Sequence, residues 1–379
     1  MAITLTCEKQ RLQDALSLAV RAVSPRTTMA ILECVLLTAQ NGVGLTISAS
    51  NLEINIDTAP IAADITMPGS VALDAKLFSE IIRKMPGELV SLTADHNNNV
   101  EVKSGRSRLT IVGQPGDEFP VMSESELVPV NQGYNLPAQT LKDMIRQTIF
   151  SVSTDQSKMV LTGELIEIKD NAMRMVAVDM YRISYKSSPL QGTATDSKAI
   201  VPAKALGELS RMLPTGSGDS EEVSVQLTEK RIIFKASNFT MISNLLEGEF
   251  IRYDQIFNED FITAVEVNRT DLLNAFERAV LIALEGKNLP TKLEINDDDL
   301  MISSRNDRGD ETEDGIPCKT DGKPLTISFN PRYFLDVLRA VDDENIVLKF
   351  NTQLSPCTIR GTEEGSDYKY LIVPLRPEL

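Results

Sequence analysis

The sequence predicts an α+β protein in which one kind of domain is repeated three times along 379 residues. Two types of amphipathic helix recur in the same order and at a nearly constant spacing, which is the signature of a triplicated unit. Between the helices, apolar and polar residues alternate with the period of two that is typical of half-buried antiparallel strands. Because the helices are few and far apart, this pattern excludes a parallel sheet built from strand–helix–strand units.

The first helix of each repeat is indicated by apolar residues at positions i, i+3, i+4, i+7, i+8 and i+11, the spacing of a helix that buries one face. In the first repeat these positions hold Leu12, Ala15, Leu16, Ala19, Val20 and Val23. A shift of 129 residues gives Leu141, Met144, Ile145, Thr148, Ile149 and Val152. A shift of 260 residues gives Leu272, Ala275, Phe276, Ala279, Val280 and Ala283.

The second helix of each repeat spans residues 76–83, 204–211 and 332–339, at a spacing of 128 residues. Every copy begins with a basic residue, has an acid four positions later and an arginine seven positions later. Positions i and i+7 lie on the same face of a helix. The sequence therefore predicts three copies of one exposed cationic helix face.

The strands are predicted from runs of alternating residues that are separated by turn signals such as Asn41-Gly42 and Glu229-Lys230. These runs cover residues 1–7, 45–56, 109–112, 173–178, 223–227, 232–234 and 346–350. Stretches that contain prolines and acids near residues 121–135 and 252–265 mark the boundaries between repeats. We therefore expect domains at residues 1–126, 127–255 and 256–379, each large enough for its own core.

The charge distribution is uneven. A net charge of −16 argues by itself against nucleic acid, because phosphate binding depends on Lys and Arg. However, the acids cluster in loop-like segments at 218–222, 296–299, 310–314 and 342–344, whereas the repeated helices are close to neutral or slightly basic. The four scattered cysteines, and the lack of an 18-residue apolar run or a signal peptide, favour a cytoplasmic protein without membrane contact.

No catalytic, metal or cofactor site is predicted. The sequence lacks a phosphate-binding loop of the Walker type and a nucleophile elbow. Its only histidine, His96, precedes an asparagine-rich turn, which excludes histidine-based triads. The acidic segment 307–314 does not have the spacing of an EF-hand.

Three side-by-side domains with two helices each suggest an arc, and two such chains closed head to tail would line a hole with twelve helices. Helix axes roughly 10 Å apart enclose a hole of about 28 Å, after one helix width is subtracted. This hole is wider than a nucleic acid duplex of roughly 20 Å, which would be attracted through its phosphates without base readout.

The sequence closely resembles the bacterial sliding clamp family, the beta subunits of DNA polymerase III. The most specific matching segments are 104–108, 118–120, 176–183, 200–204 and 370–376. The resemblance implies three clamp domains per chain and a head-to-tail homodimeric ring, with helices inside and sheets outside. It also implies a non-catalytic processivity factor that encircles duplex DNA, tethers the polymerase and is opened by an ATP-driven clamp loader.

For DNA binding we expect the cations of the inner helices and one loop: Arg26, Lys76, Arg83, Lys142, Arg146, Lys204, Arg211, Arg332 and Arg339. The resemblance also implies a pocket for the clamp-binding motifs of client proteins, among them the polymerase III catalytic subunit and the clamp loader. Its expected residues are Leu161, Val178, Met180, Tyr181, Arg182, Ile183, Ile251, Ile256, Tyr333, Leu354, Leu371, Val373, Pro374, Leu375 and Arg376. Met180-Tyr181 replaces a frequent Gly-His, Ile251 replaces a frequent Pro, and Pro377–Leu379 extends the chain, so the peptide preference is expected to differ.

The resemblance further places the dimer interface at Arg106, Arg108, Leu109, Ile111, Leu281 and Ile282. We expect the two arginines to face the acids Glu311, Glu313 and Asp314 of a second chain.

Two other interpretations of the sequence predict different behaviour. A three-repeat scaffold that binds only proteins would be a monomer that does not encircle DNA. A carbohydrate-active enzyme would need an aromatic-rich cleft, but aromatic residues make up 5 % of the chain and Trp is absent.

Overall fold

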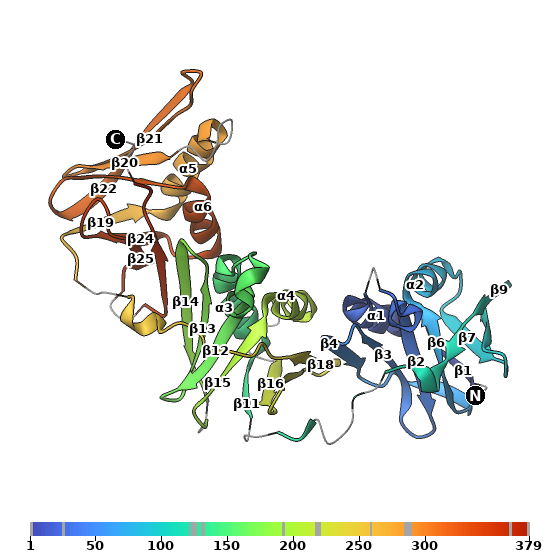
Figure 1. The fold of residues 1–379 in the computed structure, drawn as a ribbon. Helices are drawn as coiled ribbons and strands as arrows, with labels where there is room; N and C mark the ends of the chain where they lie inside the picture. Colours follow the sequence, from blue (N-terminus) through green and yellow to red (C-terminus); the bar gives the residue numbers. More distant parts are fainter. Residues whose placement is uncertain are drawn as a thin grey trace. The chain divides into compact units, whose positions relative to one another are not determined.

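The computed structural model of the chain describes residues 3–24, 27–120, 122, 127–129, 133–191, 194–216, 221–257, 260–283, 290–363 and 366–376. The chain forms two compact units, which are described separately below (Figure 1). The first unit consists of residues 1–139, 191–195 and 208–245, and the second of residues 140–190, 196–207 and 246–379. The division between the units falls inside helices α3 (Ala138–Thr148) and α4 (Ala203–Met212).

The first unit contains two antiparallel sheets and helices α1 (Lys9–Ala19) and α2 (Ala75–Lys84), which contact each other. The five-stranded sheet has the order β5 (Ala63–Met67), β1 (Ile3–Glu8), β7 (Leu89–Ala94), β8 (Asn99–Ser104) and β9 (Ser107–Val112). The nine-stranded sheet has the order β10 (Gln114–Pro115), β6 (Gly69–Asp74), β2 (Cys34–Gln40), β3 (Gly44–Ser50), β4 (Ile54–Thr58), β18 (Phe239–Asn244), β17 (Arg231–Lys235), β16 (Glu222–Leu227) and β11 (Tyr134–Pro137).

The second unit contains one twelve-stranded antiparallel sheet and helices α5 (Arg269–Ala283) and α6 (Pro331–Ala340). The strand order is β15 (Ser197–Pro202), β12 (Gly163–Lys169), β13 (Ala172–Val178), β14 (Arg182–Pro189), β26 (Tyr368–Ile372), β25 (Cys357–Gly361), β24 (Asn345–Phe350), β19 (Thr263–Asn268), β22 (Glu311–Gly322), β21 (Asp299–Arg305), β20 (Thr291–Ile295) and β23 (Leu325–Phe329). Short 3-10 helices in the two units span Val20–Ala22, Ala30–Glu33, Gly116–Glu118, Ile149–Ser151, Gln156–Thr162 and Tyr253–Gln255.

The predicted triplication of the helices is confirmed. Helices α2, α4 and α6 begin at residues 75, 203 and 331, and each is ten residues long. Local chemistry fixes two of these starts, because the Asp74 carboxylate accepts the Leu77 N–H at 2.7 Å and the Asn330 side chain accepts the Arg332 N–H at 3.1 Å. Helices α1, α3 and α5 begin at residues 9, 138 and 269, as the first apolar pattern predicts.

The sheets run across the boundaries between the repeats. Within the first unit, β4 of the first repeat pairs with β18 of the second. Within the second unit, β14 of the second repeat pairs with β26 of the third. Each compact unit therefore holds one complete repeat and half of the middle repeat, because backbone hydrogen bonds join neighbouring repeats into continuous sheets.

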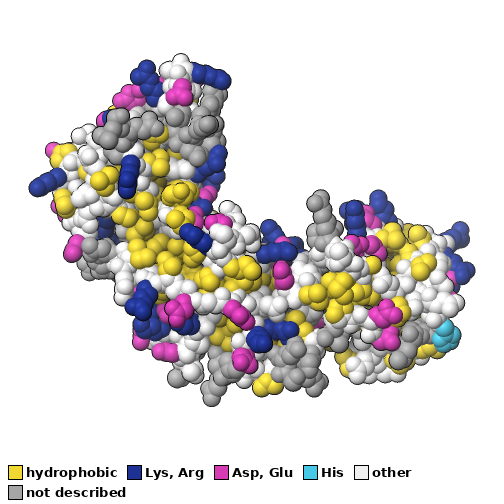
Figure 2. Space-filling model, in the orientation of Figure 1, with side chains coloured by type: hydrophobic (Ala, Val, Ile, Leu, Met, Phe, Trp, Pro, Cys, Tyr) yellow, Lys and Arg dark blue, Asp and Glu magenta, His cyan; other side chains and the backbone are white. Residues whose placement is uncertain are grey.

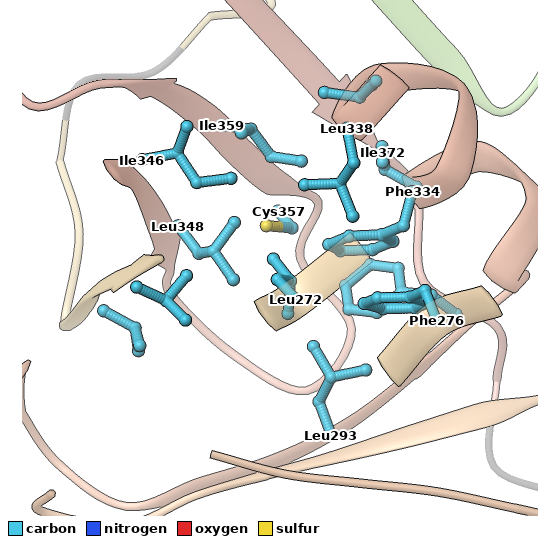
Figure 3. Packing of buried hydrophobic residues seen from close by; sticks show 14 of the residues in the cluster. Leu272, Phe276, Leu293, Phe334, Leu338, Ile346, Leu348, Cys357, Ile359 and Ile372 are labelled. Atoms are coloured by element: carbon cyan, nitrogen blue, oxygen red, sulfur yellow. The ribbon is translucent and has the colours of Figure 1, made fainter. Parts of the chain in front are cut away.

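The core of the second unit lies between its helices and its sheet (Figure 3). Phe276 of α5 stacks on Phe334 of α6, with ring centroids 4.6 Å apart, and Phe329 meets Phe334 edge-on at 5.0 Å. The sheet contributes Leu293, Ile346, Leu348, Ile359 and Ile372, all almost completely buried. This core holds the exposed faces of both helices in a fixed orientation on the sheet.

One alternating run differs from its prediction. The alternating run 45–56 was predicted as one strand, but it forms β3 and β4 with a turn between them. The Asn51 side chain causes this turn by accepting hydrogen bonds from the N–H groups of Glu53 at 3.0 Å and Ile54 at 2.7 Å.

His96 lies in an exposed turn between β7 and β8, as predicted. No helix in the described part of the chain is long and apolar enough to cross a membrane.

Candidate functional site

The cations that recur in α2, α4 and α6 are all exposed: Lys76, Arg83, Lys204, Arg211, Arg332 and Arg339. Those at the ends of the helices are paired with acids, because Arg83 contacts Glu80, Arg211 contacts Glu208, and Arg339 contacts Glu277 of α5. Those at the starts, Lys76, Lys204 and Arg332, have no side-chain partner among the described residues. Each helix therefore presents one unpaired and one neutralised cation.

The two predicted cations of α3 are less accessible, since Lys142 and Arg146 are both half-buried. Arg146 donates to the Ala340 carbonyl at 2.7 Å and pairs with Asp143 and Asp342. These contacts tie α3 to the end of α6 within the second unit, so Arg146 has a structural role whether or not it meets DNA. Arg26 lies outside the described residues.

Six of the predicted client-pocket residues lie in one apolar cluster of the second unit: Leu161, Val178, Ile183, Ile251, Leu371 and Val373. The sequence interpretation missed other members of this cluster, namely Val160, Leu165, Val176, Tyr185, Ile200, Leu246, Phe250, Tyr253 and Phe257. Several of these come from strands β12, β13 and β15, where alternation was the only available signal. Figure 2 shows apolar side chains gathered on this part of the surface.

A second group of predicted pocket residues surrounds the guanidinium of Arg182. The guanidinium lies 4.7 Å from the Tyr333 ring centroid and forms ion pairs with Asp179 and Asp336. Tyr181 stacks on Tyr333 at 5.9 Å with an interplanar angle of 18°. The Val373 N–H donates to the Tyr181 carbonyl at 2.8 Å, which joins this aromatic pair to the apolar cluster.

The remaining predicted pocket residues lie at other places in the second unit. Leu354 lines another pocket, of about 470 Å³, together with Ile262, Pro324 and Leu325. Met180 is exposed, and its sulfur lies 2.7 Å from the ammonium of Lys158. Ile256 and Arg376 are exposed, and Pro374 and Leu375 are half-buried. Pro377–Leu379 lie outside the described residues.

The predicted dimer residues lie on or beside β9 in the first unit and on α5 in the second unit, and their expected acidic partners lie on β22 of the second unit. In the described part of the chain, β9 pairs only with β8, and the segment 311–317 of β22 pairs only with β21. Leu109 and Val112 of β9 are 42 % and 78 % exposed, whereas Ile111 is buried within its own unit. Val112 was missed by the sequence interpretation.

The charges at these edges are partly paired within the chain. Arg108 pairs with Glu101, and Arg278 of α5 pairs with Asp314 at 2.7 Å. Arg106 is exposed without a side-chain partner among the described residues, and Glu311 and Glu313 are also exposed. Leu281 of α5 is 67 % exposed, and Ile282 is half-buried.

Comparison with known proteins covers almost the whole chain. Family models match residues 3–123, 135–251 and 254–376, and describe the N-terminal, central and C-terminal domains of the DNA polymerase III beta subunit. A "Beta sliding clamp" of Staphylococcus epidermidis is 32 % identical over 364 residues, which is 94 % of each chain. The "Beta sliding clamp" of Bacillus subtilis is 31 % identical over 380 residues, or 98 % of this chain and 99 % of that protein.

Solved structures agree with this result. The crystal structure of the DNA polymerase sliding clamp from Bacillus subtilis superposes with a TM-score of 0.94 at 29 % identity, and covers 100 % of both chains. The crystal structure of a putative DNA polymerase III beta subunit from Eubacterium rectale superposes with a TM-score of 0.93 at 34 % identity, and covers 99 % of this chain and 100 % of that one.

Proposed function

The chain belongs to the DNA polymerase III beta subunit family, the beta sliding clamps, and on this premise we propose that two copies close head to tail around duplex DNA. The ring acts as a processivity factor that tethers the catalytic subunit of DNA polymerase III and performs no chemistry of its own. The single observation that carries this proposal is the exposed cationic face of α2, repeated on α4 and α6. Family membership disfavours a protein-only scaffold. The protein acts in the cytoplasm.

The arrangement of charges supports retention by topology rather than by affinity. Half of the six recurring cations are neutralised by an acid on the same or the adjacent helix. The unpaired cations at the helix starts attract phosphates without reading bases, and ions screen this attraction at physiological salt. Such a surface permits sliding along the duplex.

We expect the protein to remain on nicked circular DNA after loading with its clamp loader and ATP, and to leave when the circle is cut. The reason is that a closed ring slides off a free end, whereas weak phosphate contacts alone cannot hold it. Gel filtration of DNA-bound protein before and after linearisation measures the retained fraction. Equal retention on circular and linear DNA would contradict the proposal, and linear DNA with blocked ends is the control.

We further propose that the dimer interface joins β9 of one chain to the free edge of β22 in the other. Leu109 and Val112 supply apolar contact. Arg106 and Arg108 approach Glu311 and Glu313 of the second chain. On assembly, Arg108 leaves its partner within the chain, Glu101, and pairs with an acid of the second chain instead.

The double variant Arg106→Glu with Arg108→Glu is expected to shift the protein from dimer to folded monomer, because the reversed charges repel the acids of β22. Sedimentation velocity at micromolar concentration measures this shift, and circular dichroism reports folding. Lys230→Glu with Lys235→Glu is the control, since it makes the same charge change at exposed positions of the β17 hairpin. A double variant that remains a dimer would rule out this interface.

The apolar cluster and the Tyr181–Tyr333 pair are proposed as the site for clamp-binding motifs of the polymerase III catalytic subunit, the clamp loader and other client proteins. A groove that combines apolar residues with a few polar groups suits a short peptide that folds on binding. Met180-Tyr181 stands where family members often have Gly-His, and Tyr181 stacks on Tyr333 beside Arg182, so we expect the peptide preference to differ.

A further inference from the structure

A cationic pocket adjoins the apolar cluster in the second unit. The pocket has a volume of about 170 Å³ and is lined by four basic and two acidic residues, together with apolar ones. The charged residues are Lys169, Arg174, Lys198, Arg252, Glu167 and Asp254. Leu165, Phe250, Ile251 and Tyr253 line the pocket and also belong to the apolar cluster.

Strand register places these charges side by side. Glu167 of β12 is opposite Arg174 of β13 on one side and opposite Lys198 of β15 on the other. Side chains alternate along a strand, so Lys169 lies on the same face of β12 as Glu167 and Leu165. The other face of β12 carries the buried residues Ile166 and Ile168. Lys198, Glu167 and Arg174 therefore form one row across three strands, on the face opposite Ile166 and Ile168, and Arg252 joins the lining from the segment before Tyr253.

Within this row, the acid Glu167 is already satisfied. It accepts the Tyr253 hydroxyl at 2.6 Å and contacts Arg174 at 3.4 Å. Burial and the adjacent Glu167 raise the pKa of Tyr253, so the phenol keeps its proton and remains the donor. By contrast, Lys169, Lys198 and Arg252 are exposed and make no side-chain ion pair or hydrogen bond to any described residue. A chain of net charge −16 thus presents three unpaired cations beside an apolar surface.

We propose that the cationic pocket binds an acidic side chain of a client peptide whose apolar residues occupy the adjoining cluster. The inference rests on the proposed function of that cluster. The shared residues Leu165, Phe250, Ile251 and Tyr253 make the two surfaces continuous, so one short peptide spans both. The pocket selects among clients by charge, while the cluster supplies most of the apolar contact.

The lining favours a peptide over nucleic acid. Glu167 and Asp254 lie among the cations and repel a run of phosphates more strongly than one carboxylate. Tyr253 packs against Tyr185, with ring centroids 5.9 Å apart, and Tyr185 also packs against Phe257 at 6.1 Å. Tyr253 is only 8 % exposed, so it offers little surface on which a base can stack.

The test uses six labelled peptides that share the clamp-binding segment of the polymerase III catalytic subunit from the same organism. They are extended by two Asp, two Asn or two Lys residues, with each extension placed at either end in separate peptides. Fluorescence anisotropy measures Kd for the full-length protein at low and at physiological salt. We expect the best Asp peptide to bind roughly three- to tenfold more tightly than its Asn counterpart, as exposed ion pairs allow.

The double variant Lys198→Glu with Arg252→Glu should abolish this preference and reverse it in favour of the Lys peptide. Lys230→Glu with Lys235→Glu carries the same charge change away from the pocket and should keep the wild-type preference. Equal binding of the Asp and Asn peptides to the wild type overturns the pocket. An equal loss of the preference for Asp in both double variants would also overturn the pocket, because it would show a general effect of net charge.

Two further outcomes separate this inference from its premise. If no peptide binds the wild type, the proposed client site itself fails, and the inference fails with it. If labelled single-stranded DNA loses affinity in the Lys198→Glu, Arg252→Glu variant while all peptides bind it as they bind the wild type, the pocket serves nucleic acid and the proposal is wrong.

Discussion

Replacing Glu164 by Gln is expected to stabilise the protein at alkaline pH and to have little effect at acidic pH. Glu164 is fully buried on β12, and neither carboxyl oxygen has a hydrogen-bond partner among the described residues. The nearby Thr148 hydroxyl donates its only proton to the Met144 carbonyl at 2.6 Å. Burial raises the pKa of the Glu164 carboxyl from 4.5 to about 8.

The direction of the pH dependence follows from this raised pKa. Below pH 4.5 the carboxyl is protonated in both the folded and the unfolded chain, so ionisation has no effect on stability. As the pH rises towards 8, the unfolded chain loses this proton while the folded chain keeps it, and stability falls. The full loss is as much as roughly 5 kcal/mol, which Glu164→Gln removes.

Thermal unfolding at pH 5 and pH 8.5 measures this effect. The variant should melt roughly 10 °C above the wild type at the higher pH, and close to it at the lower. Glu164→Met, which has a similar volume and no polar oxygen, should behave in the same way. Glu229→Gln, at an exposed turn, is the control and should change neither transition. A stability difference that is the same at both pH values would contradict the assignment of Glu164 as a buried, protonated acid.

Replacing Phe334 by Ala is expected to destabilise the second unit by about 3–5 kcal/mol. The Phe334 ring is fully buried between Phe276 and Phe329, which lie on different elements of the core. Its removal leaves a cavity and loosens α6 from α5, so the side chains of both helices lose their support. We therefore also expect weaker retention on circular DNA.

Urea unfolding followed by circular dichroism measures the change. Phe261→Ala is the matched control, because Phe261 is 40 % exposed; the Lys349 ammonium lies 4.1 Å from its ring centroid. The control should cost less than about 1 kcal/mol. A loss of similar size in both variants would show that the Phe276–Phe334 stack is not the centre of this core.

The helices were predictable from the sequence because their positions depend on local signals. The 128-residue spacing and the apolar positions are both visible without a structure. The grouping of the chain into two units was not, because it depends on which strands become neighbours. No local pattern shows that β4 will pair with β18, or β14 with β26. The boundaries at residues 1–126, 127–255 and 256–379 remain predictions.

The candidate sites were predictable to different degrees. The exposure of Lys76 and of its equivalents follows from helix periodicity, and the structure confirms it. The ion pair between Arg146 and Asp342 could not be predicted in this way, because Asp342 is 196 residues further along the chain. Six of the fifteen residues that the resemblance implies for the client site lie in the apolar cluster, and the site itself remains a proposal. The members that the resemblance missed, such as Tyr253 and Phe250, adjoin the cationic pocket, where register brings β12, β13 and β15 together.

The pairing of β4 with β18 and of β14 with β26 has a mechanical consequence. Pulling neighbouring repeats apart would break several backbone hydrogen bonds at once, so these junctions resist separation. The β9 edge and the first half of β22 have no such bonds on their outer sides within the described chain. A loader that opens the ring should therefore pull the two protomers away from each other, and leave the junctions between repeats intact.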